Sequence, residues 1–232
     1  MTPSSLHRLA LAGLVAFLLG AAACAETPDA TQDDSIEAFR TRANTGDAEA
    51  QFNLGVMYSY GEGVPQDAVE AVAWYRRAAE QGLATAQNRL GEIYDTGDGV
   101  PEDFVEAAAW YRRAADQGHT EAQRNLGLLY HFGRGVPQDE AEAAVWYRQA
   151  AEQGHTEAQS LLGFIYINFQ PGVPEDNIEA YKWFSLAATN SIGQQKEMSI
   201  KWRDTAAERL TPEQLAEGQR RAREWFEAHP PE

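Results

Sequence analysis

The residues that could do chemistry in this chain are two equivalently placed histidines, an acidic loop and a single cysteine. His119 and His155 stand 36 residues apart and could be imagined as a metal pair, but neither has a cysteine or another histidine nearby. The loop DTGDG at 95–99 lacks the alternating carboxylates of an EF-hand calcium loop. We interpret the histidines as solvated helix ends and the loop as structural, and we expect no metal and no cofactor.

Motifs of known catalytic mechanisms are absent from the sequence. It contains no G-x-S-x-G, H-E-x-x-H, S-x-x-K or phosphate-loop pattern. Carboxylates are spread along the whole chain, so no pair stands out as a general acid and base. A formal net charge of −16 argues against nucleic acid or an anionic lipid surface as a ligand. The sequence therefore predicts a protein that is not an enzyme.

The N-terminus predicts export. An apolar run from Leu9 to Ala23 follows Arg8, is too short to span a bilayer comfortably and ends in small residues, which indicates a signal peptide over 1–24. The sequence LGAAAC around Cys24 is similar to a bacterial lipobox, although Ala21 stands where leucine is usual. Lipidation of Cys24 and ordinary cleavage after an A-x-A site both remain open. We expect a periplasmic or lipid-anchored protein that contacts a membrane only through such a lipid, with a flexible linker over 25–35.

Four segments align at a spacing of 36 residues, at 47–82, 83–118, 119–154 and 155–190. A fixed period of this length is typical of a solenoid, in which each unit buries its apolar face against its neighbours. The fourth segment has one extra loop residue near Pro171. We expect a half-repeat over 36–46 before the array and two capping helices over 191–228 after it, all forming one solenoid domain over 36–228.

Each repeat is predicted to be a helical hairpin. Ala50, Leu54 and Tyr58 recur in every copy and share one face of the first helix. Gly55 also recurs, and because glycine inside a helix costs about 1 kcal/mol relative to alanine, it indicates a close helix–helix approach. Asp67 stands three residues before Glu70, a D-x-x-E capping box that is repeated four times at the start of the second helix.

The remaining aromatic residues are assigned to the core and to the C-terminal cap. Trp74 and its three equivalents stand near alanines, which favours interlocking helices over a cofactor site. Thr211 is predicted to cap the last helix, with Gln214 three residues later. The end of the array is predicted to be covered by three apolar side chains: Trp202, Leu215 and Trp225.

The pattern A-x-A-Q-x-x-L-G-x-x-Y, G-x-G-V-P-x-D, E-A-x-x-W-Y-R-x-A-A-x-Q-G resembles the Sel-one-like repeat family, which is related to tetratricopeptide repeats. The resemblance covers 47 to about 190. It implies an all-α, right-handed α/α superhelix that acts as an adaptor or scaffold and binds a protein or peptide. Cysteine-rich relatives are associated with β-lactam binding or hydrolysis, but they carry a cysteine pair in each repeat, which this chain lacks. A purely structural envelope lipoprotein is a further alternative.

The candidate binding residues lie on the first helix of each repeat, at positions that vary while the core stripe stays fixed. Exposed aromatic side chains beside arginine are typical anchors of a binding site. The alternative is that some of these side chains pack inside the superhelix. The candidates are Phe52, Asn53, Val56, Tyr60, Asn88, Arg89, Glu92, Arg124, Asn125, Leu128, His131, Phe132, Ser160 and Phe164.

Overall fold

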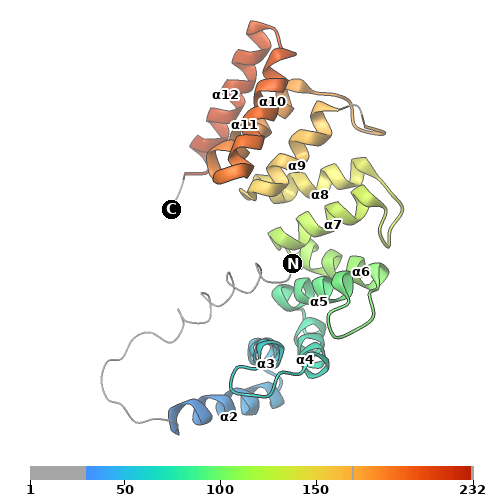
Figure 1. Cartoon of the computed structure of the whole chain (residues 1–232), viewed down its shortest axis with the longest axis vertical. Coiled ribbons are helices and arrows are strands. Elements are labelled where there is room, and N and C mark those ends of the chain that lie inside the picture. The colour runs from blue at the N-terminus through green and yellow to red at the C-terminus, as the bar shows by residue number, and fades with distance from the viewer. Residues whose placement is uncertain (1–29, 169, 231–232) are drawn as a thin grey trace.

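The computed structural model describes residues 30–168 and 170–230 (Figure 1). The predicted signal peptide and Cys24 lie outside these residues. The regular structure within the described ranges is helical, in the order α2 (Ala30–Asn44), α3 (Ala48–Tyr60), α4 (Ala68–Glu80), α5 (Ala84–Thr96), α6 (Phe104–Asp116), α7 (Thr120–Phe132), α8 (Glu140–Glu152), α9 (Thr156–Ile167), α10 (Asn177–Asn190), α11 (Gly193–Glu208) and α12 (Pro212–Ala228).

The helices stack in chain order along a curved column that runs from α2 to α12 (Figure 1). Each helix from α3 to α9 packs mainly on the helix before it and the helix after it, and α10 packs on α9, α11 and α12. We call α3, α5, α7 and α9 the A helices, and α4, α6, α8 and α10 the B helices. This nearest-neighbour arrangement confirms the predicted all-α solenoid of helical hairpins.

Large and small residues interlock in the core as the repeat pattern predicts. The side chains of Tyr75, Tyr111, Tyr147 and Phe184 are almost completely buried, one for each repeat. A Cβ atom added to Gly91 would lie 2.4 Å from Cδ1 of Tyr111, and one added to Gly127 would lie 2.6 Å from Cδ1 of Tyr147. The recurring glycine therefore lets the aromatic ring of the B helix lie directly against the A helix.

The predicted capping box of the B helices is half right. The carboxylate of Asp67 accepts hydrogen bonds from the backbone N–H groups of Val69 and Glu70, both at 3.0 Å, and the aspartates of the other three repeats also cap their helices. The other half of the prediction, in which the aspartate N–H donates to the glutamate side chain, is wrong. The N–H of Asp67 donates to the carbonyl of Tyr58 at 2.9 Å, which closes the hairpin loop, so Glu70 has no free donor to bond.

The two ends of the array differ in how well their boundaries were predicted. Helix α2 begins at Ala30, so residues 30–35 of the expected linker belong to a helix. At the other end, Thr211 caps α12 and forms a full capping box with Gln214, as predicted. Trp202 and Trp225 pack against the core of the last repeat. Leu215 is half-buried but lies outside that cluster.

Candidate partner-binding face

A ladder of glutamine side chains fixes the spacing of the A helices. Gln87, buried on α5, donates to the carbonyl of Ala79 at the end of the preceding B helix at 3.0 Å. It accepts a hydrogen bond of 2.7 Å from Gln117 at the end of its own B helix. Gln51 and Gln123 repeat both contacts. Helices α3, α5 and α7 are thus each held between the ends of two neighbouring helices, through a buried glutamine that accepts from an exposed one.

A second ladder joins each B helix to the A helix of the next repeat. The guanidinium of Arg76 donates to the Tyr94 hydroxyl, and the same contact recurs between Arg112 and Tyr130 and between Arg148 and Tyr166. These arginines and tyrosines are engaged between repeats. They are therefore less available to a partner than side chains that make no contact between repeats.

The fourteen predicted candidates fall into three groups, and the first is exposed. Asn53 is exposed, Tyr60 is 46% exposed and Phe132 is 58% exposed. Tyr60 and Phe132 are the last residues of α3 and α7, at equivalent positions of the first and third repeats. Large apolar side chains left in water at the same repeat position are suitable contacts for a partner.

The second group is packed into the superhelix, which was the alternative interpretation. The ring of Phe52 lies 5.4 Å from that of Tyr75, and Phe164 lies 5.1 Å from Phe184 and 4.9 Å from Trp202, centroid to centroid. Val56 and Leu128 are also half-buried against core clusters. Phe52 and Phe164 are therefore half-buried rather than fully exposed, with Phe52 against a ring of a B helix and Phe164 against rings of a B helix and of α11.

The third group is polar and already paired. Asn88 is only 7% exposed, so it is not a free groove residue, and its amide donates to Glu92 at 2.8 Å. Arg89 also bonds Glu92, at 3.0 Å. Ser160 donates to the carbonyl of Thr156 on its own helix at 3.3 Å.

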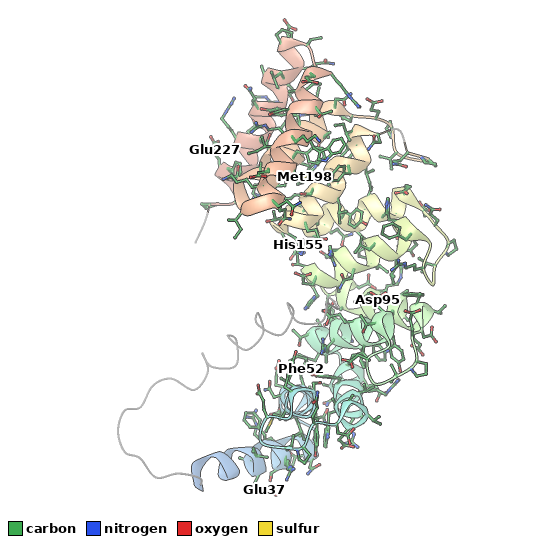
Figure 2. All side chains as sticks on the ribbon, in the orientation of Figure 1. Glu37, Phe52, Asp95, His155, Met198 and Glu227 are labelled. Carbon is green, nitrogen blue, oxygen red and sulfur yellow. The ribbon has the colours of Figure 1, made fainter. Side chains whose placement is uncertain are left out.

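An ion pair and a histidine hydrogen bond join α7 to the start of α9. Arg124 donates to Asn125 at 2.6 Å and to Glu157 on the next A helix at 2.5 Å. Nε2 of His155 lies 3.0 Å from Glu121, and this hydrogen bond is the main reason why the pKa of Glu121 is below its ordinary value. Figure 2 labels Phe52, Asp95 and His155, which mark successive levels of the stack.

The two equivalent histidines cap helices, which corrects their interpretation as solvated ends. Nδ1 of His119 accepts the N–H of Ala122 at 3.3 Å, and Nδ1 of His155 accepts the N–H of Ala158 at 3.1 Å. The side chain of His155 is only 14% exposed. Burial lowers the pKa of His119, which favours the neutral ring that a capping acceptor requires. The third candidate histidine, His131, lies 2.8 Å from the buried Glu140.

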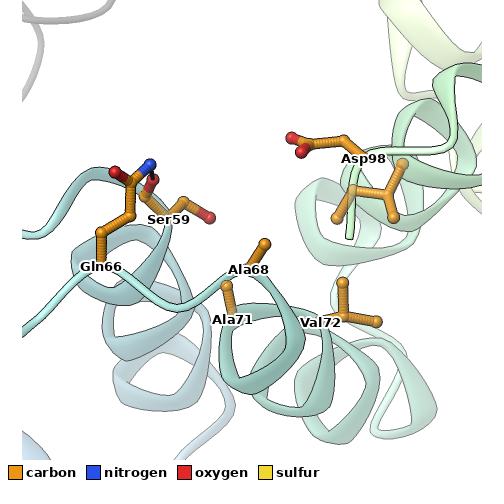
Figure 3. Close-up of a pocket in the computed structure, with 7 residues that line it drawn as sticks. Ser59, Gln66, Ala68, Ala71, Val72 and Asp98 are labelled. Carbon is orange, nitrogen blue, oxygen red and sulfur yellow. Dashed lines mark hydrogen bonds between the residues drawn. The ribbon is translucent and has the colours of Figure 1, made fainter. Parts of the chain in front are cut away.

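Two hollows of different size lie along the described part of the stack. The smaller, between the α3–α4 loop and the next repeat, has a volume of about 50 Å³, room for only a few water molecules (Figure 3). The larger, of about 390 Å³, lies where α9, α10 and α11 meet. Two candidates, Ser160 and Phe164, line it together with Met198 and Trp202 of α11, which sequence reasoning missed because α11 does not follow the repeat.

Other kinds of site are not supported by the described part of the chain. Within residues 30–168 and 170–230, no three histidine, cysteine or acidic side chains gather in a way that could hold a metal ion. Among the helices of these same ranges, none combines the length and the apolar character needed to cross a bilayer.

Comparison with known proteins agrees with the repeat pattern. The Sel1 repeat model matches residues 48–83, 84–119, 120–155 and 156–191. A protective antigen of uropathogenic Escherichia coli strains with an SLR fold is 37% identical, with a TM-score of 0.71 over 83% of this chain. This chain spans only 40% of that protein. A Sel1 repeat protein from Oxalobacter formigenes is 35% identical, with a TM-score of 0.62 over 75% of this chain and 76% of its own.

No curated protein matches the chain. Sel1 repeats are typical of protein-interaction scaffolds and are generally not catalytic. With four matched repeats that cover more than half of the sequence, the chain belongs to the Sel1 repeat family.

Proposed function

We propose that this protein is a non-catalytic scaffold of the bacterial cell envelope that binds a protein or peptide along its A helices. One observation carries the proposal. Every A helix has the same buried stripe, whereas the residues beside the stripe change from repeat to repeat, and Asn53, Tyr60 and Phe132 among them are exposed. Exposed side chains that vary on a constant framework are suited to recognising one partner.

The ladders support this proposal because they fix the surface before a partner arrives. Gln51, Gln87 and Gln123 hold the A helices in register, and the Arg–Tyr contacts join successive hairpins. A preorganised surface loses little conformational entropy on binding, so more of the contact free energy contributes to affinity.

The test compares two pairs of apolar side chains that lie on different helices. The double variant Tyr60→Ser/Phe132→Ser removes exposed aromatic groups from the A helices. The control Val69→Ser/Val105→Ser removes side chains that are 69% and 65% exposed on the B helices α4 and α6. After crosslinking in the native cell, the partner bands should be lost from the first variant and kept by the control. Equal crosslinking of both variants would place the binding surface elsewhere.

The envelope location is part of the proposal and has its own test. If Cys24 carries lipid, the chain should stay with membranes at high salt, and mass spectrometry should find a diacylated N-terminal cysteine. Cys24→Ser should release it to the soluble fraction. A mature form that starts at Glu26 would refute the lipid anchor but not export.

Hydrolysis of β-lactams is the enzymatic alternative to a scaffold. We expect no nitrocefin turnover by the purified protein, since the chain has a single cysteine and none of the cysteine pairs of the relatives associated with that activity. Nitrocefin turnover that persists through repeated purification, and that disappears when the protein is removed from the sample, would overturn the non-catalytic assignment.

A further inference from the structure

We infer that the hollow between α9 and α11 receives an aromatic side chain from the partner and that basic residues flank this side chain. The inference rests on the proposed function, because it names the anchor point and the chemistry of the same partner. The walls of the hollow are mainly apolar. Most of them are formed by Phe164, Phe184, Met198 and Trp202. Its volume of about 390 Å³ is enough for a large side chain together with some of its backbone.

The walls are already arranged for an aromatic guest. The rings of Phe164 and Trp202 meet edge to face at 4.9 Å, and those of Phe184 and Trp202 are stacked at 6.4 Å. Met198 is 44% exposed at the rim, and a thioether makes favourable contacts with aromatic rings. Nε1 of Trp202 is buried and has no hydrogen-bond partner among the described residues. Gln194 and Gln195 add amide groups that could bond a peptide backbone.

The negative charge of the A helices, along which the partner is proposed to lie, selects the residues that flank the aromatic side chain. The A helices carry the carboxylates of Glu49, Glu92, Asp95, Glu121 and Glu157 but only two arginines, Arg89 and Arg124, and each arginine is paired with a carboxylate. Glu157, one helical turn from Ser160 at the hollow, is offset by Arg124. The A-helix carboxylates that pair with no arginine of the described residues are Glu49, Asp95 and Glu121. Of these three, Glu121 on α7 is 56% exposed, and its hydrogen-bond partner is the ring of His155. Helix α11 is neutral, with three basic and three acidic residues, so it does not offset this charge.

The first measurement uses the two methionines that the structure describes. In the full-length protein labelled with 13C at the methionine methyl groups, Met198 reports on the hollow, and Met57, packed in the core of the first repeat, is the internal control. The probe is a short synthetic peptide, blocked at both ends, with one tryptophan between lysines. We expect it to shift the Met198 signal and to leave Met57 unchanged. An unchanged Met198 signal overturns the inference.

Matched peptides test the two parts of the proposed chemistry. Replacing the tryptophan of the peptide by serine should abolish the Met198 shift, and replacing its lysines by glutamates should weaken binding at least tenfold at low salt. If the glutamate peptide binds as tightly as the lysine peptide, the assignment of a basic partner is wrong. If Met198 shifts with protein concentration alone, a second copy of this chain fills the hollow, and the inference is overturned.

Protein variants separate this inference from the proposed function. Met198→Gln should raise the Kd of the lysine peptide about tenfold, because it replaces an apolar contact at the rim by an amide. Val69→Gln, a comparable change at an exposed position on α4, should leave the Kd unchanged. Circular dichroism should show both variants folded. If Met198→Gln still crosslinks to the cellular partner and binds the lysine peptide normally, while Tyr60→Ser/Phe132→Ser loses the crosslinked partner, the hollow is not the anchor and the proposed function stands.

Discussion

The glutamine ladder ends one step early, and this leads to a prediction about stability. Gln81, Gln117 and Gln153 donate to the A-helix glutamines of their repeats. In the fourth repeat the equivalent residue is Asn190, the last residue of α10, which is one methylene shorter. Gln159 is completely buried, and its Oε1 has no partner among the described residues. We predict that Asn190→Gln completes the ladder and stabilises the protein.

The magnitude follows from three contributions. A buried acceptor without a partner costs about 1–3 kcal/mol, and a new hydrogen bond between neutral amides removes most of that cost. Ordering an exposed glutamine side chain opposes the gain by about 1–2 kcal/mol. The net increase in the free energy of unfolding should be about 0.5 kcal/mol, which raises the thermal midpoint by about 1–2 °C for a chain of this size.

Far-UV circular dichroism during heating and in urea measures the effect, with two matched variants. Asn190→Met supplies the same length without an amide and should give no gain. Gln81→Asn shortens the ladder in the first repeat, leaves Oε1 of Gln51 without its donor and should cost about 1–2 kcal/mol. A rise in midpoint for Asn190→Met equal to that for Asn190→Gln would show that packing rather than hydrogen bonding is responsible. An unchanged midpoint for Asn190→Gln would refute the reasoning outright.

Three further predictions concern the repeat itself. Gly91→Ala should lower the free energy of unfolding by about 1–3 kcal/mol in urea titrations, because its Cβ would lie 2.4 Å from the Tyr111 ring; an unchanged midpoint would contradict this close approach. Asp103→Ala should lower the free energy of unfolding by about 0.5–2 kcal/mol, and Glu106→Ala should lower it clearly less, since only the aspartate caps α6. Equal losses for the two variants would mean that Glu106 also takes part in capping, as the sequence predicted. Burial lowers the pKa of His119 below its ordinary value of 6.5. The contribution of the neutral ring to stability is therefore complete above pH 6.5, and it is lost as the pH falls through the lowered pKa of the folded state. His119→Asn, which can cap in any state, should therefore lose less thermal midpoint than the wild type between about pH 7 and about pH 5.

The fold was predictable because its determinants are local and periodic. Leu54 and Gly55 recur at a fixed spacing, so each copy of the pattern confirms the others. The Asp67 cap was predictable because it depends only on the residues that follow it. Its reciprocal partner was not, because the N–H of Asp67 is used by Tyr58 across the hairpin loop, a contact that depends on how the loop closes.

The candidate site was predictable by helix and not by residue. Variation between repeats located Tyr60 and Phe132, which the structure leaves exposed. The same reasoning selected Asn88 and Phe164, which are respectively buried and packed against Trp202. A residue that varies can do so because it faces solvent or because its neighbour on another helix varies with it, and a single sequence does not separate these two causes.

The C-terminal end of the array is the place where several repeat contacts change together. The ring of the B helix loses its hydroxyl, from tyrosine to Phe184, and Ser185 stands where Arg148 bonds the next tyrosine in the preceding repeat. With no further A helix to receive these contacts, α11 covers the core through Trp202, which stacks on Phe184. The indole of Trp202 covers the core but does not fill the space in front of Phe164, and Met198 stays partly in water. A helix that served only to end the solenoid would be expected to present a polar outer face without such a hollow. The departure from the repeat at this end is the reason why we place α11, which closes the array, in the proposed recognition site as well.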